Sequence, residues 1–162
     1  MASIFDHLRD EHQRLRESLL RLGDHAGREP HEQHEQLCGL LCQYTAYARA
    51  EERAFYSYMI HLKEVQQPAL QALAEHERLD ALLRQAERMP LGDARWRSTI
   101  TFLCERMIQH LREEENGLLA RARSALSERE ADGLGAHFQA ERARVHRDLT
   151  RLDAPAPEHP AT

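Results

Sequence analysis

Residues that break helices are scarce in this sequence. Seven glycines and six prolines are spread over 162 residues, while leucine, alanine, arginine and glutamate dominate. These four residue types favour helices over strands. A chain of this length fits one domain with a buried core. We therefore expect an all-α domain over residues 1–152, followed by a disordered, proline-rich tail at 153–162 ("DAPAPEHPAT").

Cysteine and long apolar runs are also lacking. Cys38, Cys42 and Cys104 are an odd set without CxxC spacing, which argues against a disulfide framework and indicates a reducing compartment. No segment approaches the roughly 18 apolar residues of a membrane span, and the start "MASIFDHLRDEH" does not resemble a signal peptide. We expect a cytoplasmic protein with no membrane partner, as a monomer or a weak dimer.

A basic surface is missing as well. The net charge is -5 with a pI near 6.1, and the positive charge, almost all arginine, alternates with acidic residues along each segment. This pattern is typical of solvated helix faces. Nucleic-acid binders carry a basic patch, so we expect no nucleic-acid partner.

Five amphipathic segments predict five helices. The expected ranges are about 3–22, 31–64, a third helix opening at Pro68 and ending before "MPLGD", a fourth with a stripe from Ile100 to Leu118, and a fifth from Ser127 to Leu152. Ser3 with Asp6, and Ser127 with Glu130, have the spacing of capping boxes. Four long helices with short breaks predict an antiparallel up-down-up-down bundle, with an additional C-terminal helix.

Polar residues interrupt the apolar stripe of each bundle helix. The first stripe is Phe5, Leu8, Leu15, Leu19 and Leu22, with His12 at the missing step. The second carries Tyr47 and Glu51 before Phe55 and Tyr58, the third has His76 after Leu70 and Leu73, and the fourth has His110 and Glu114. At 1.5 Å per residue, His12 and Tyr47 lie nearly level in an antiparallel pair. Glu52 and Glu115 point ~100° away from the stripe, toward solvent or outer partners.

Buried carboxylates need a counter-charge. An unpaired one costs several kcal/mol, so two glutamates with three histidines favour a shared metal pair. Imidazole and carboxylate suit iron, manganese or zinc. The HxxxE spacing alone is weak evidence, because it occurs five times, and His137/Glu141 is the next candidate. The alternative is a metal-free polar network, which would have to satisfy every group.

The segments "IFDHLRDEHQRLRESLLRL", "AEERAFY", "LAEHERLDALL" and "HLREEENGLLARA" resemble, in order, the four helices of hemerythrin-like (HHE) cation-binding domains. That family follows the pattern His, HxxxE, His, HxxxE. The resemblance implies two iron ions, joined by an oxo or hydroxo bridge, that bind or react with O2, peroxide or nitric oxide. It implies His12, Glu51, His76, His110 and Glu114 as ligands, with the two glutamates bridging.

Tyr47 stands where the family keeps a histidine. Its hydroxyl could stay protonated and hydrogen-bond a bound species, ligate iron as phenolate, or mark a site with one ion. We favour ligation, and we expect Tyr47 to be both a ligand and a catalytic residue, because a bound cation depresses the pKa of its ligands. A phenolate stabilises ferric iron, which favours peroxide or nitric oxide chemistry over reversible O2 carriage. The alternatives are a non-catalytic sensor signalling through the fifth helix or Cys38 and Cys42, and a metal-free interaction module.

Overall fold

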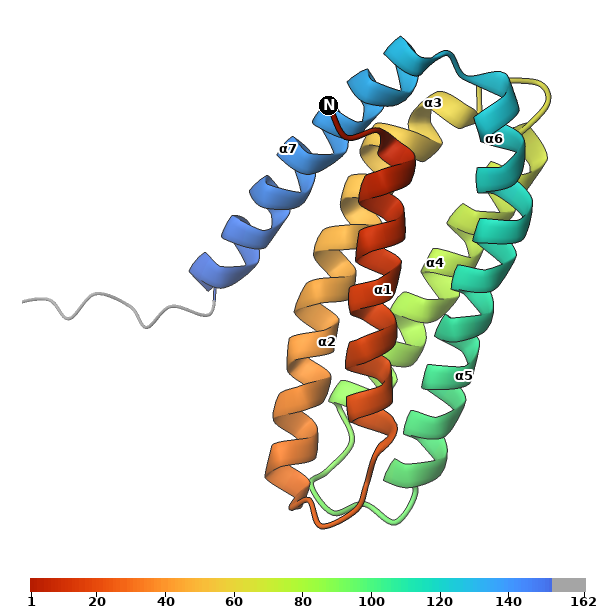
Figure 1. Ribbon diagram of the computed structural model, residues 1–162. Helices are drawn as coiled ribbons and strands as arrows, with labels where there is room; N and C mark the ends of the chain where they lie inside the picture. The colour runs from red at the N-terminus through yellow and green to blue at the C-terminus, as the bar shows by residue number, and fades with distance from the viewer. Residues whose placement is uncertain (153–162) are drawn as a thin grey trace, which may run out of the picture.

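The computed structural model describes residues 1–152, so the expected disordered tail at 153–162 lies outside the described residues. Every regular element in this part is helical (Figure 1). The long helices are α1 (Ile4–Gly23), α2 (Pro30–Glu51), α4 (Gln66–Glu87), α5 (Trp96–Glu114) and α7 (Glu128–Leu152). Shorter pieces complete the chain: the π-helical turns η1 (Glu52–Tyr56) and η2 (Glu115–Leu119), with α3 (Ser57–Met59) and α6 (Ala120–Ala125).

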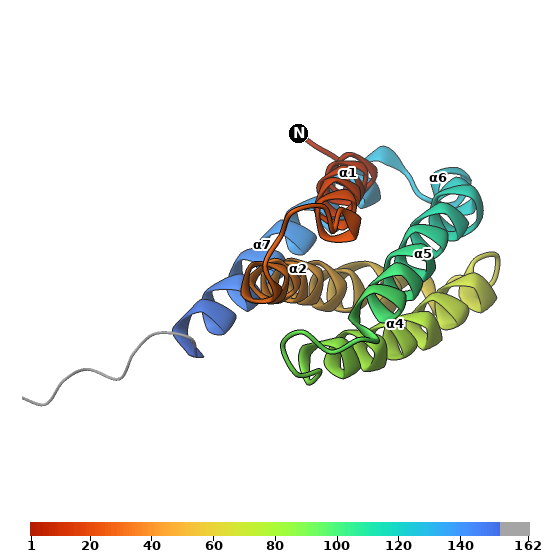
Figure 2. The same cartoon turned by 90° about the horizontal axis from the view of Figure 1, so that it is seen from below.

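The helices α1, α2, α4 and α5 form a four-cornered bundle. Each packs against the next in chain order, and α5 closes the ring against α1. The view along the bundle shows these four around a common centre, with α7 outside them against α1 and α2 (Figure 2). The predicted all-α bundle with an additional C-terminal helix is therefore confirmed. Within residues 1–152, no helix combines the length and apolar character needed to cross a membrane.

Both predicted capping boxes are present. Ser3 Oγ accepts a hydrogen bond from the Asp6 backbone N–H at 3.3 Å, and the Ser3 N–H donates to Asp6 Oδ2 at 3.0 Å. At the start of α7, the Ser127 N–H donates to Glu130 Oε2 at 2.8 Å and Ser127 Oγ accepts from the Glu130 N–H. Each box satisfies two backbone donors that a helix start leaves unpaired.

The predicted stripe of α1 faces the bundle core. Its five apolar residues, Phe5, Leu8, Leu15, Leu19 and Leu22, are all at most 6% exposed. Burying each such side chain contributes roughly 1.5–3 kcal/mol. His12 lies in the same stripe and is fully buried, so the core surrounds the polar centre on this side.

The sequence pattern predicted a continuous second helix to Glu64, and this prediction is wrong. The α-helical hydrogen bonding ends at Glu51, a π-helical turn follows, and α3 ends at Met59. α4 then begins at Gln66, two residues before Pro68. Tyr58 and Leu70, both expected on apolar stripes, are 36% and 44% exposed. The π turn explains Tyr58, because its wider turn rotates every later side chain relative to the 3.6-residue period.

Gly135 lets α7 pack directly on the start of α1. A Cβ built at Gly135 would lie 2.8 Å from the Ala2 carbonyl oxygen and 2.9 Å from the Ile4 backbone nitrogen. We expect Gly135→Ala to lower the free energy of unfolding by about 1–3 kcal/mol, because backbone cannot yield as a side chain does. Gly133 has nothing within 4 Å of such a Cβ, so Gly133→Ala should raise stability by up to about 1 kcal/mol. Urea unfolding measures both, and equal effects would contradict the close packing.

Candidate metal centre

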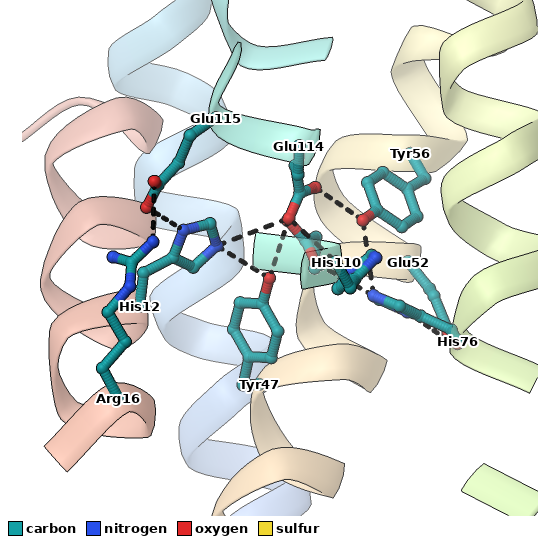
Figure 3. Close-up of polar contacts among 10 residues, drawn as sticks. His12, Arg16, Tyr47, Glu52, Tyr56, His76, His110, Glu114 and Glu115 are labelled. Carbon is teal, nitrogen blue, oxygen red and sulfur yellow. Dashed lines mark hydrogen bonds and ion pairs between the residues drawn. The ribbon is translucent and has the colours of Figure 1, made fainter. Parts of the chain in front are cut away.

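All six sequence-predicted site residues meet in the middle of the bundle. They come from four helices: His12 from α1, Tyr47 and Glu51 from α2, His76 from α4, and His110 and Glu114 from α5. None is more than 4% exposed. Figure 3 shows His12, Tyr47, His76, His110 and Glu114 directed toward one another. One ligand atom each from His12, Glu51 and Glu114 lie within 4.8 Å of one another.

Three atoms that could ligate a metal form a tight triangle on the α1 side. His12 Nε2 lies 2.9 Å from the Tyr47 hydroxyl and 3.4 Å from Glu114 Oε2. The Tyr47 hydroxyl donates to Glu114 Oε2 at 3.1 Å. Ligands at right angles around one ion, with bonds of about 2.1 Å, are separated by roughly 3 Å. The triangle therefore has the dimensions of one face of a coordination shell.

The α4 side has a second group of donor atoms. His76 Nε2 lies 3.4 Å from Glu51 Oε2, and His110 Nε2 lies 3.8 Å from Glu114 Oε2. The rings of His76 and His110 meet edge to face, with centroids 4.9 Å apart. Glu114 thus contacts both groups, Oε2 being near His12 on one side and near His110 on the other.

Glu51 and His110 have buried polar atoms that make no hydrogen bond within residues 1–152. Neither carboxylate oxygen of Glu51 makes a hydrogen bond with any residue in 1–152, and the same holds for His110 Nε2. Glu51 is completely buried. An unsatisfied buried carboxylate is costly, and native proteins keep such groups where a cation or a reaction needs them. These orphaned atoms, all of metal-ligand type, fit a bound cation.

Two matched outer contacts fix the histidines of α1 and α4. His12 Nδ1 lies 2.8 Å from Glu115 Oε1, and Arg16 donates to the other Glu115 oxygen at 2.7 Å (Figure 3). His76 Nδ1 lies 2.9 Å from Glu52 Oε1. Because each carboxylate holds the Nδ1 proton, each ring presents Nε2 to the centre. This second contact is the usual way in which a ligating histidine is oriented.

Glu52, which contacts His76, also pairs with an arginine. Arg49 lies 3.2 Å from Glu52 and also pairs with Asp80. Glu52 and Glu115 are each only partly exposed, with 19% and 34% of the side chain accessible. The sequence left open whether these two glutamates face solvent or contact the ligands from outside. In the structure they contact His76 and His12.

Tyr56 is a site residue that the sequence reasoning missed. It is fully buried, its hydroxyl donates to Glu114 Oε1 at 2.6 Å, and it lies 3.4 Å from His76 Nε2. Tyr56 is five residues after Glu51, which is off the face in an α-helix but on it across a π turn. Such turns occur frequently at functional sites. The sequence signal for this residue was a tyrosine five residues after Glu51, the glutamate in the apolar stripe.

We expect Tyr56→Phe to lower the free energy of unfolding of the metal-free protein by about 1.5 kcal/mol. The variant deletes a donor to a buried carboxylate, and hydrogen bonds to charged groups contribute about 1.5–3 kcal/mol. Tyr58→Phe is the matched control, since its hydroxyl bonds to Glu130 at the surface and its loss should cost less than about 0.5 kcal/mol. Thermal unfolding would compare them, and equal losses would contradict the buried role of Tyr56.

The charges at the centre are balanced by protons. Burial and the charge of Glu114 raise the pKa of Glu51. Burial also opposes the Glu114 anion, but hydrogen bonding with His12 lowers its pKa below the usual value. His12 and His76 are buried, yet hydrogen bonds and charges of nearby carboxylates raise the pKa of each to about 9. The protons on their Nε2 atoms therefore occupy the places that cations would take.

His110 and Tyr47 are neutral in this balance. Burial lowers the pKa of His110 to about 4, even though Glu114 opposes the shift. Its Nε2 lone pair is thus available to a metal. Burial, and then the charge of Glu114, raise the pKa of Tyr47 well above its ordinary value. Without a cation the Tyr47 hydroxyl keeps its proton and hydrogen-bonds Glu114.

The other HxxxE pairs lie away from this centre. His137 is exposed, and Glu141 pairs with Arg53 and Arg144 on the outside of the bundle. Glu11, on α1, is buried but belongs to a separate cluster of ion pairs that includes Arg142 of α7. It is 3% exposed, and Arg14 and Arg142 lie 2.9 and 2.8 Å from its Oε1.

Comparison with known families identifies a matching family model. The family model described as the hemerythrin HHE cation binding domain matches residues 3–122. This range contains all six residues of the centre together with Glu52, Tyr56 and Glu115. Searches of curated proteins and of solved structures found no match.

Proposed function

Because the chain belongs to the hemerythrin HHE cation-binding domain family, we propose that its centre holds two iron ions and reacts with peroxide. The observation that carries the proposal is the Tyr47 hydroxyl, 2.9 Å from His12 Nε2 and 3.1 Å from Glu114 Oε2. It occupies a ligand position where the family pattern has a histidine. O2 and nitric oxide are further small molecules that such a centre would bind.

Two sets of side chains would hold the ions. His12 and Tyr47 would hold one, His76 and His110 the other, and Glu51 and Glu114 would serve both. The unpartnered oxygens of Glu51 and the unpartnered Nε2 of His110 support this assignment. Bound iron would supply a Lewis acid and a one-electron redox couple at each position.

Tyr47 favours the ferric state in this arrangement. Ligation requires loss of the hydroxyl proton, which the neighbouring cation promotes in the same way that zinc acidifies its bound water. A phenolate stabilises ferric over ferrous iron, so a persistent diferrous state for O2 carriage is disfavoured. Peroxide suits a ferric centre better. Disproportionation of two H2O2 molecules to O2 and two H2O also needs no external reductant.

The protein contributes exclusion of water, orientation and proton transfer. The six central residues are buried within apolar helix faces, which strengthens each electrostatic contact. His12 connects this dry centre to the surface, because its Nδ1 contacts Glu115, whose side chain is 34% exposed and paired with Arg16. Glu115 is thus a group that can exchange a proton with water. The Tyr56 hydroxyl donates a hydrogen bond to Glu114 Oε1 and keeps that carboxylate in place.

The test combines metal analysis with a visible spectrum. Protein purified with iron should contain two iron ions per chain and show a broad phenolate-to-iron band, which Tyr47→Phe should abolish while iron content stays above one per chain. Tyr56→Phe is the matched control and should keep the band. A wild-type spectrum without the band, or one that Tyr47→Phe leaves unchanged, would show that Tyr47 is not a ligand.

Oxygen evolution from peroxide separates the remaining hypotheses. The iron-loaded wild type should evolve one O2 for every two H2O2 consumed. A loaded protein that binds iron but consumes no peroxide would be a sensor rather than an enzyme. A chain that binds no metal, and whose stability is indifferent to chelators and to His110→Ala, would be a metal-free interaction module.

A further inference from the structure

A cleft leads from the protein surface to the centre between α4 and the α5–η2 segment. Its volume is about 530 Å³, and its lining includes His110 and Glu114, which are 3% and 4% exposed. The outer part of the same cleft is lined by exposed Gln71, Arg78 and Arg121. The cleft therefore joins solvent to two residues of the candidate metal centre.

Among residues 1–152, the other residues of the centre are buried. His12, Tyr47, Glu51 and Tyr56 have no exposed surface, and His76 is 1% exposed. Four other surface hollows on residues 1–152 are lined by none of these residues. His110 Nε2, buried and without a hydrogen-bond partner, belongs to the residue at the inner end of the cleft.

Two small residues line the cleft on opposite walls. Ala72 belongs to α4 and Gly117 to the π turn η2. A Cβ built at Gly117 would meet nothing within 4 Å, so the glycine is not required by packing. A longer side chain at either position would fill the cleft instead.

Ion pairs fix the wall around this gap. Glu75 is only 8% exposed and pairs with Arg106 of α5 and, at 3.0 Å, with Arg78. The pair with Arg106 joins α4 to α5 beside the cleft. Arg78 and Arg121 on the rim are offset by Glu75 and Glu113. Such a mixed rim gives no strong field of either sign, so passage depends on size more than on charge.

We infer that this cleft is the route by which small ligands reach the metal centre, and that Ala72 and Gly117 set its width. The inference rests on the proposed function, because it presumes a loaded centre. It assigns the cleft to molecules the size of peroxide or azide.

The test measures the rate at which azide changes the visible spectrum of the iron-loaded protein by stopped flow. Gly117→Phe should slow this change at least tenfold, leaving the iron content and the azide concentration for half-saturation unchanged, because it obstructs entry and exit equally. Gly117→Ala should differ from wild type by less than about twofold. Gly39→Phe places the same ring at an exposed glycine of α2, where a Cβ also meets nothing within 4 Å, and should have no effect.

Ala72→Phe obstructs the opposite wall and should slow the azide reaction as Gly117→Phe does, which keeps the test decisive if one variant fails to fold. Folded, iron-loaded variants that react at the wild-type rate would show that ligands enter elsewhere. A loaded wild type whose spectrum azide never changes would equally count against the route. Absence of iron from the wild type is a different result, since it overturns the proposed function itself.

Discussion

Glu51→Gln should abolish iron binding and at the same time stabilise the metal-free protein. We expect iron content to fall below about 0.2 ions per chain, and the free energy of unfolding at pH 7 to rise by about 2 kcal/mol. Glu51 is completely buried, and neither oxygen has a hydrogen-bond partner among residues 1–152. Although Oε2 lies 3.4 Å from His76 Nε2, relieving a buried carboxylate that makes no hydrogen bond typically recovers about 1–3 kcal/mol. For a domain of this size, this corresponds to a rise in Tm of roughly 4–8 °C.

Iron binding is expected to fall while the stability of the metal-free protein rises, and this combination is specific to a binding site. If the carboxylate merely stabilised the fold, replacing it with a neutral amide would lower the free energy of unfolding. Glu75→Gln is the matched control, because Glu75 is also buried but is paired with Arg106 and Arg78. That variant should lose stability and retain iron. If Glu51→Gln lowers the stability of the metal-free protein, the carboxylate is structural and the proposed metal pair loses the support of the Glu51 oxygens.

The bundle could be predicted from sequence because its signals are local. The capping residues Ser3 and Ser127 act within one helical turn, and the α1 stripe follows the 3.6-residue period throughout. The six central residues could be selected for a related reason. Each interrupts an apolar stripe, and in an antiparallel bundle of known order the stripes meet at one axis.

The π turns could not be predicted, and they account for the main errors. Each follows a central glutamate directly, η1 after Glu51 and η2 after Glu114. The hydrophobic pattern here is ambiguous, since both Tyr56 and Tyr58 are aromatic and only one can face inward. The inserted residue turns Tyr56 toward Glu114 and leaves Tyr58 at the surface with Glu130. The choice depends on tertiary contacts that no local window contains.

The sequence also could not predict which histidines Glu52 and Glu115 contact. Glu52 and Glu115 were expected to point away from the stripe, but the histidine that each one meets comes from another helix, 24 or 103 residues distant. Helix α4 gives a similar case. Leu70 is more hydrophobic than Ala69 and Ala72, yet the two alanines are buried and the leucine is exposed. Which of these side chains is buried depends on the space between the helices rather than on hydrophobicity alone.

His12→Leu and His110→Leu should both remove iron but differ in their effect on the metal-free protein. We expect His12→Leu to lower the free energy of unfolding by about 3–5 kcal/mol, because removing one member of a buried pair leaves the other unpaired. His12 contacts Tyr47 at 2.9 Å, Glu115 at 2.8 Å and Glu114 at 3.4 Å. His110 Nε2 makes no hydrogen bond within residues 1–152, so a leucine of similar volume should change stability by less than about 1.5 kcal/mol.

The comparison separates a residue needed for the fold from one retained for a ligand. Urea unfolding of chelator-treated protein gives the two stability changes, and metal analysis of iron-loaded protein gives the occupancies. A small loss for His110→Leu with full loss of iron would mean that His110 is kept at the centre for the metal alone. A loss of 3 kcal/mol or more for His110→Leu would instead make it part of a structural polar network. Retention of two iron ions by either variant would remove that histidine from the ligand set.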